Sequence, residues 1–190
     1  VFIAGGAGGV GALLIKLLRT DGVHRIYTTA GNEASRQALL AIGLFEKQIL
    51  DYRTPDFVQQ ALNRNGQAFD YCIDLVGGIQ AEVCAGLLSI HGSYADITSL
   101  GTPASREALF DKGATVYNIS NYAVSLANDP KTLSIYGQNL QRLTELIEAG
   151  AITPPLVSVV GPLQTDTVRM AHSLLETNQS KGKKLVMTIP

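Results

Sequence analysis

The chain has 190 residues, of which 46% are hydrophobic and 16% are charged. This length and composition suit a globular protein with one good core and a small additional unit. The net charge of −1 and the pI near 6.3 provide no basic field, which argues against nucleic-acid or anionic-membrane binding. The apolar stretches are shorter than the roughly 20 residues of a membrane-spanning helix, so we expect no membrane partner.

The first informative segment follows the apolar residues Val1–Ala4. Gly6, Gly8 and Gly11 fit the Gly-x-Gly-x-x-Gly pattern, in which glycines allow a tight turn, close approach to a pyrophosphate and helix–sheet packing. A leucine-rich helix and a second β-rich segment follow at the βαβ distance. The pattern predicts a dinucleotide site, with the amides of Gly8, Gly9 and Val10 on the pyrophosphate. The predicted cofactor-binding residues of this loop are Gly6, Ala7, Gly8, Gly9, Val10 and Gly11.

An alternative interpretation of the same loop is the short-chain dehydrogenase pattern Gly-x-x-x-Gly-x-Gly, which Gly5, Gly9 and Gly11 satisfy. That family needs a Tyr-x-x-x-Lys pair, and no tyrosine of the chain has a lysine four places later. We therefore disfavour this alternative, because its catalytic pair is absent.

Strand and helix patterns alternate along the next hundred residues. This alternation predicts an α/β fold with a doubly wound parallel sheet, the Rossmann fold. Asn32 is expected to cap the second helix, and Gly43 and Gly92 are each expected to end a helix. The predicted strands are Val1–Ala4, Arg25–Thr29, Gln48–Tyr52, Phe69–Val76, Ser93–Ile97 and Thr115–Ile119. The predicted helices are Val10–Arg19, Glu33–Ile42, Pro55–Asn63, Gln80–Leu88 and Ser105–Lys112.

The ends of the parallel strands hold the other candidate binding residues. No acid follows Thr29 to bond the ribose hydroxyls of NAD, whereas Asn32, Ser35 and Arg36 lie close by, so we favour NADP over NAD. The alternatives are that Arg36 is only a solvated helix residue and that Glu33 selects NAD. Ligands of such sheets bind beyond the carboxyl ends of strands, so Val76, Gly77 and Ser99 are expected to flank the cofactor, although they also suit simple turns.

The pattern changes near Pro130. A long helix, Pro130–Ala149, is closed by Gly150, and two prolines follow, so we predict one domain over residues 1–150 and a separate segment over residues 151–190. This segment contains a small C-terminal strand-helix-strand unit, predicted as Leu156–Val160, Asp166–Glu176 and Lys184–Ile189. Two strands are not stable alone, so we expect the unit to pair with another part of the protein. The short first strand and the absence of an initiator Met suggest that this part precedes Val1.

Cysteine and histidine are too sparse to predict a metal site. Cys72 and Cys84 are expected to be buried thiols, which suits a reducing, cytoplasmic setting. The three histidines, His24, His91 and His172, stand apart with no ligand at a suitable spacing, and no nucleophile–base pair is visible. We therefore predict neither catalytic nor metal-binding residues within this chain.

The chain resembles the medium-chain, zinc-type alcohol dehydrogenase superfamily, most closely its quinone oxidoreductase-like branch. The resemblance implies that Tyr52 lies beside the adenosine phosphate, that Arg36 replaces a lysine usual near Ser35, and that a catalytic GroES-like domain precedes Val1. It also implies a homodimer through the edge strand Thr115–Ile119 and the apolar residues after it. The segments that carry the resemblance are Ala4–Gly11, Thr29–Gly31, Ile49–Arg53, Phe69–Gly78, Leu146–Gly150 and Lys181–Val186.

Together these features predict the cofactor-binding part of an NADP-dependent oxidoreductase. The nicotinamide carries the hydride, and a quinone, enone or carbonyl substrate would be held by the other domain. The alternatives are a zinc-dependent alcohol dehydrogenase and a protein that senses the dinucleotide without turnover.

Overall fold

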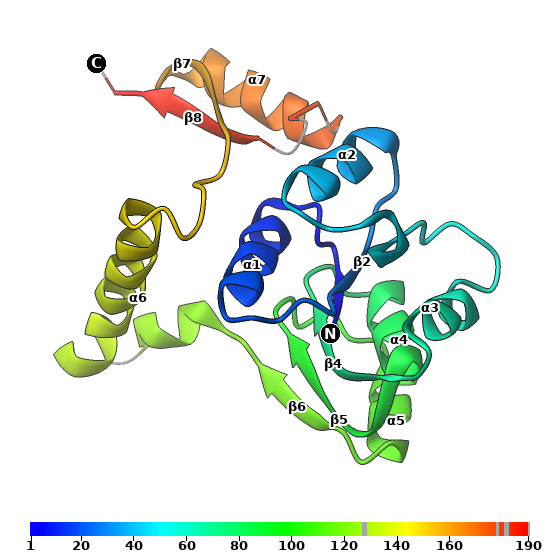
Figure 1. The fold of residues 1–190 in the computed structure, drawn as a ribbon. Helices are drawn as coiled ribbons and strands as arrows, with labels where there is room; N and C mark the ends of the chain where they lie inside the picture. Colours follow the sequence, from blue (N-terminus) through cyan, green and yellow to red (C-terminus); the bar gives the residue numbers. More distant parts are fainter. Residues whose placement is uncertain (127–128, 178, 181–182, 190) are drawn as a thin grey trace.

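A computed structural model describes residues 1–126, 129–177, 179–180 and 183–189. In these residues one parallel sheet of six strands has the order β3-β2-β1-β4-β5-β6, and a second sheet pairs β7 with β8 (Figure 1). The predicted doubly wound α/β fold is confirmed. The strands of the large sheet are β1 (Phe2–Ala4), β2 (Tyr27–Thr29), β3 (Ile49–Leu50), β4 (Phe69–Asp74), β5 (Leu88–Asp96) and β6 (Thr115–Asn118).

Helices cover both faces of the large sheet because its central strands are apolar on both sides. In β1, Phe2 enters one core and Ile3 enters the other, as the alternation of side chains along a strand requires. The core around Ile3 contains Ile15 and Leu39 of the first two helices, and the core around Phe2 contains residues of the next three. These helices are α1 (Gly9–Thr20), α2 (Glu33–Ala41), α3 (Phe57–Asn65), α4 (Ile79–Leu87) and α5 (Pro103–Asp111).

The ends of several elements follow the predicted signals. Asn32 caps α2, since its side chain accepts a hydrogen bond of 2.8 Å from the amide of Ser35. Gly43 follows the end of α2 with a φ of +90°. A short 3-10 helix, η1 (Glu46–Gln48), then leads into β3. Both cysteines are buried thiols, and burial raises the pKa of Cys72 to about 12.

One predicted helix stop is wrong. Gly92 lies inside β5, and α4 already ends at Leu87. The register between β4 and β5 shifts beside this glycine, because Phe69 pairs with Leu88 whereas Tyr71 pairs with Ser93. A Cβ on Gly92 would lie 2.7 Å from Cγ of Leu88, so the glycine lets this buried leucine fold over the irregular strand.

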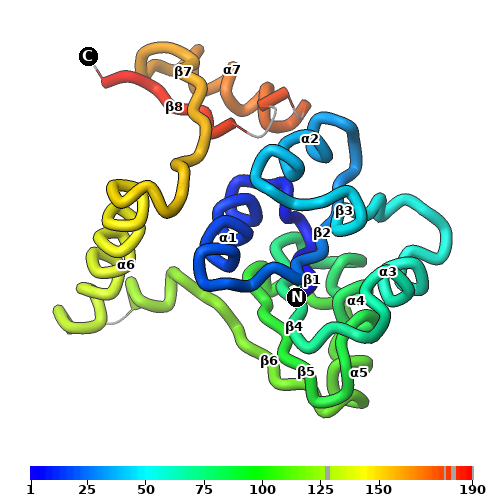
Figure 2. Tube along the Cα trace, in the orientation of Figure 1, coloured from blue at the N-terminus to red at the C-terminus, as the bar shows by residue number. Residues whose placement is uncertain are grey.

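Beyond β6 the chain leaves the large sheet through η2 (Asn121–Leu126) and α6 (Pro130–Glu148), and it then enters the small unit beside α2 (Figure 2). The predicted strand-helix-strand order is confirmed as β7 (Val157–Pro162), α7 (Thr165–Glu176) and β8 (Lys184–Thr188). Gly150 follows the end of α6 with a φ of +68°, as expected. Lys181 and Gly182, within the predicted closing motif, lie outside the described residues.

Candidate functional site

The glycine-rich loop between β1 and α1 has little room for side chains. Gly5 turns the chain with a φ of +84°, and the amide of Gly6 donates to Oγ1 of the buried Thr28 over 3.1 Å. A Cβ on Gly11 would lie 2.5 Å from Cα of Gly6. Helix α1 therefore approaches the loop so closely that only glycine fits at position 11. The close packing at Gly11 is what the Gly-x-Gly-x-x-Gly pattern predicts for its third glycine, whereas the tight turn is made by Gly5 and not by Gly6.

The N-terminus of α1 presents amides to the open side of this loop. Gly8 precedes the helix and supplies no side-chain cap, and the first turn contains no acidic residue. The amides of Gly9, Val10 and Gly11 have no carbonyl partner within the helix, because they belong to its first turn. The Gly8 amide donates to the Gly5 carbonyl over 3.0 Å, so of the three amides expected on a pyrophosphate those of Gly9 and Val10 remain. Such an end attracts anions.

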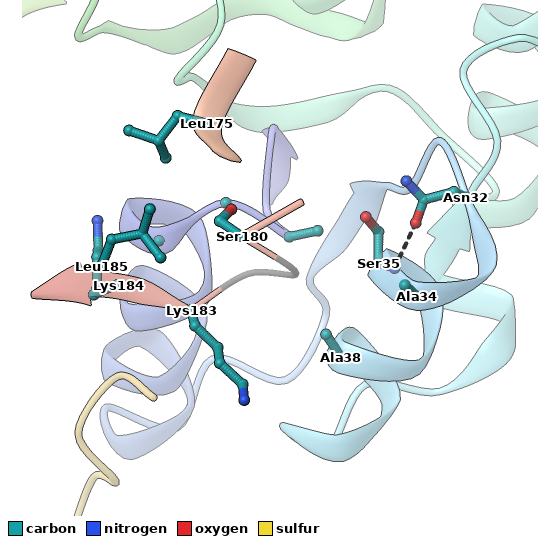
Figure 3. Close-up of a pocket in the computed structure, with 12 residues that line it drawn as sticks. Asn32, Ala34, Ser35, Ala38, Leu175, Ser180, Lys183, Lys184 and Leu185 are labelled. Carbon is teal, nitrogen blue, oxygen red and sulfur yellow. Dashed lines mark hydrogen bonds between the residues drawn. The ribbon is translucent and has the colours of Figure 1, made fainter. Parts of the chain in front are cut away.

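The first of two cavities at this end lies between the loop, α2 and the C-terminal unit (Figure 3). It has a volume of about 490 Å³. Its lining includes Ala7, Gly8, Gly9, Asn32, Ala34, Ser35, Ala38, Leu175, Ser180, Lys183, Lys184 and Leu185. The cavity therefore joins the predicted phosphate loop to residues from the far end of the chain.

The second cavity, of about 520 Å³, lies at the carboxyl ends of the central strands. It shares Ala7, Gly8, Asn32 and Ser35 with the first cavity and extends toward Tyr52, whose hydroxyl packs over Gly31. Oε1 of Gln80 is buried there with no hydrogen-bond partner among the described residues. Its lining is Gly5, Ala7, Gly8, Thr29, Ala30, Gly31, Asn32, Ser35, Tyr52, Val76 and Gln80.

A buried carboxylate holds the wall of the second cavity in place. Asp74, at the end of β4, is fully buried, and its Oδ1 accepts from the amides of Val76 and Gly77 over 2.9 and 2.8 Å. Its Oδ2 accepts from the Tyr94 hydroxyl over 2.9 Å. Burial and the nearby Asp74 charge raise the pKa of Tyr94, which keeps this hydroxyl a donor. The carboxylate thus fixes the turn that carries Val76.

The predicted site residues divide into three groups. Most converge on the two cavities: Ala7, Gly8, Gly9, Thr29, Asn32, Ser35, Tyr52 and Val76. Gly6, Val10, Gly11 and Gly77 shape the adjoining backbone, and their predicted contacts remain predictions. The last two lie elsewhere, because Arg36 forms an ion pair with Glu46 and the amide of Ser99 donates to Asp96 over 2.8 Å. Neither of these two lines either cavity.

Sequence reasoning missed the contribution of the C-terminal unit. Ser180, Lys183 and Lys184 line the first cavity, although no local pattern connects them with the glycine-rich loop. The only available signal was the basic cluster in the closing motif Lys181–Val186.

No group of three or more His, Cys, Asp or Glu side chains among the described residues converges as a metal site. No helix in the same residues is long and apolar enough to cross a membrane.

The strand order, the glycine-rich loop and the free helix end define a dinucleotide-binding α/β domain. The chain belongs to a narrower class, because residues 46–186 match the family model described as "Zinc-binding dehydrogenase". It is a member of the medium-chain, zinc-type dehydrogenase superfamily and is similar to its quinone oxidoreductases and enoyl reductases. It corresponds to the cofactor-binding part of these NAD(P)-dependent oxidoreductases.

Three relatives illustrate this membership. The chain is 28% identical over 196 residues to the NADPH-dependent alkenal/one oxidoreductase of Arabidopsis thaliana, and covers 41% of that protein. A putative zinc-dependent alcohol dehydrogenase from Rhizobium etli superposes with a TM-score of 0.84 at 19% identity. Escherichia coli quinone oxidoreductase, solved with NADPH, superposes with a TM-score of 0.77 at 22% identity. The Rhizobium etli structure aligns with 98% of this chain, and the Escherichia coli structure aligns with 97% of it. The chain spans 53% and 56%, respectively, of the lengths of these two proteins.

Proposed function

We propose that the protein containing this chain transfers hydride from NADPH to a quinone, an enone or another carbonyl compound. The observation that carries the proposal is the pair of cavities joined at the amides of α1, in a chain of the dehydrogenase family. NADPH supplies the hydride when it is bound, and the chain's residues bind and orient it.

The described residues fit a dinucleotide. The open helix end suits a pyrophosphate, and Asn32 and Ser35 connect the two cavities where a ribose would lie. The NADPH complex of the quinone oxidoreductase and the NADPH-dependent relative support NADP over NAD.

We place the substrate in a further domain that the C-terminal unit helps to complete. The division at residue 150 is supported by the small sheet, in which Val157 and Val159 are 59% and 62% exposed, and by Leu156 just before it, which is 71% exposed. Apolar strands with this exposure need a covering partner. The buried free thiols of Cys72 and Cys84 support a cytoplasmic location.

Activity measurements on the intact protein test this proposal. We expect NADPH oxidation that depends on a quinone or an enone, with deuterium passing from C4-labelled NADPH into the product. Binding of NADPH without reduction of any quinone, enone or carbonyl acceptor would instead favour the dinucleotide sensor. Loss of turnover after removal of a bound zinc ion would favour the zinc-dependent alcohol dehydrogenase.

We also propose that the protein forms a homodimer through the edge strand β6. All four residues of β6 are exposed, and Val116, Tyr117 and the following Ile119 are 46%, 53% and 47% exposed. An apolar edge of this kind favours pairing with a second copy across a two-fold axis.

Replacing Val116 with lysine should therefore convert the dimer into a monomer, because a charged edge strand resists pairing. Light scattering of the intact protein over a range of concentrations measures the change. Thr144→Lys, on an exposed face of α6, is the matched control and should remain dimeric. A parent that is monomeric at every concentration, or a Val116→Lys variant that still dimerises, would contradict this interface.

A further inference from the structure

Two adjacent lysines approach the first cavity from the C-terminal unit. Lys184 begins β8, and its side chain lies over the glycine-rich loop, since a Cβ on Gly9 would be 2.5 Å from Lys184 Cε and closer still to Nζ. Lys183 precedes it in the chain, and Figure 3 shows its side chain extending in a different direction, toward Ala38 of α2. Neighbouring residues of an extended chain point to opposite sides, so the pair presents two separate charges.

The two arginines nearest the ribose side of the site are already paired. Arg36 forms an ion pair with Glu46. Arg53, next to Tyr52, donates from Nε and Nη2 to both oxygens of Asp51 over 2.9 and 2.7 Å. These hydrogen bonds lower the pKa of Asp51 to about 2. Both arginines therefore have a carboxylate partner, and neither lines the cavities.

The two lysines differ from these arginines both in their position at the cavity and in their lack of a carboxylate partner. Each lines the first cavity, and among the described residues neither has a carboxylate oxygen within 4.0 Å. An ammonium group without a carboxylate partner is available to an incoming phosphate. Lysine also has a long flexible stem, so its charge can follow a phosphate within a cavity of this size.

Accepting the proposed function, we propose that Lys183 supplies the positive charge that selects the 2′-phosphate of NADPH, and that Lys184 pairs with the pyrophosphate. Lys184 lies over Gly9, whose amide points at the pyrophosphate position common to NADPH and NADH. Lys183 lines the cavity that Asn32 and Ser35 also line, where the proposed function places the adenosine ribose. Lys183 thereby takes the role that the sequence suggested for Arg36.

This division of charge predicts different losses for the two lysines. Lys183→Gln should weaken NADPH binding about 10- to 100-fold, as for one charged hydrogen bond, and should leave NADH binding within about twofold. Lys184→Gln should weaken NADPH and NADH by similar factors, because both contain the pyrophosphate. Arg36→Gln should reduce NADPH binding less than Lys183→Gln does.

Calorimetric titration of the intact protein with NADPH and with NADH, at one low ionic strength, measures all these affinities. Lys47→Gln is the control, since this lysine of η1 lines neither cavity, and its affinities should equal those of the parent. A thermal melt of each variant identifies any loss of folding, and Lys183→Arg, which retains the charge, should restore the preference for NADPH.

The outcomes separate this inference from the proposed function. If the parent binds neither dinucleotide, the proposed function fails and the inference fails with it. If the parent binds NADPH but Lys183→Gln binds it equally well, only the role of Lys183 is overturned. A loss selective for NADPH in Arg36→Gln alone would return that role to Arg36. If Lys183→Gln lost affinity for NADPH and NADH equally, this lysine would not recognise the 2′-phosphate.

Discussion

Replacing Gly8 with valine should abolish measurable binding of NADPH and of NADH. Gly8 immediately precedes α1 and lines both cavities, so a valine side chain would project where a pyrophosphate must approach the amides of Gly9 and Val10. Loss of two charge-assisted hydrogen bonds, each worth about 1.5–3 kcal/mol, corresponds to an affinity loss of roughly 100-fold or more. Titration of the folded variant with both dinucleotides measures the effect.

The fold should tolerate this substitution better than the site does. Gly8 has a φ of −73°, which other residues adopt readily, and a Cβ there would meet only the Gly5 carbonyl oxygen, at 3.2 Å. Gly137→Val, on the exposed surface of α6, provides the same change of residue in open space and should leave dinucleotide affinity at the parental value. An unchanged affinity in a folded Gly8→Val protein would refute the phosphate-loop assignment.

The fold could be predicted because each of its signals is local. Apolar strands alternate with capped helices, and the one seriously misplaced boundary concerns Gly92, where the chain passes from α4 into β5 without a loop. A glycine usually ends a helix, but here it makes room for Leu88 beside an irregular register. That role depends on a partner strand, which a local pattern does not contain.

The site could be predicted only as far as local motifs reach. The glycine-rich loop and Asn32, Ser35 and Tyr52 carry recognisable signals, and the structure brings them together around two cavities. The pairing of Arg36 with Glu46 and the approach of Lys183 to α2 depend on tertiary packing between distant segments. The spacing and composition of the sequence do not predict charges that act through such contacts.

The largest loss of stability is expected when Asp74 is replaced with alanine. The substitution removes the acceptor of three hydrogen bonds and leaves without a partner the buried Gly77 amide, the buried Tyr94 hydroxyl and the partly buried Val76 amide. Each of the two buried donors costs about 1–3 kcal/mol when it is left unpaired, so we expect the free energy of unfolding to fall by about 2–6 kcal/mol. Urea denaturation of the intact protein gives this value if its transition is two-state.

Asp74→Asn is the matched control, because its amide oxygen can still accept from Val76 and Gly77 while its NH₂ group faces a hydroxyl that can also accept. Its loss of stability should be clearly smaller than that of Asp74→Ala. The alanine variant should also bind NADPH more weakly where it remains folded, since Val76 lines the second cavity and loses its anchor. Equal stabilities of the alanine variant and the parent would show that the three hydrogen bonds contribute nothing net, and that water or local rearrangement satisfies the donors.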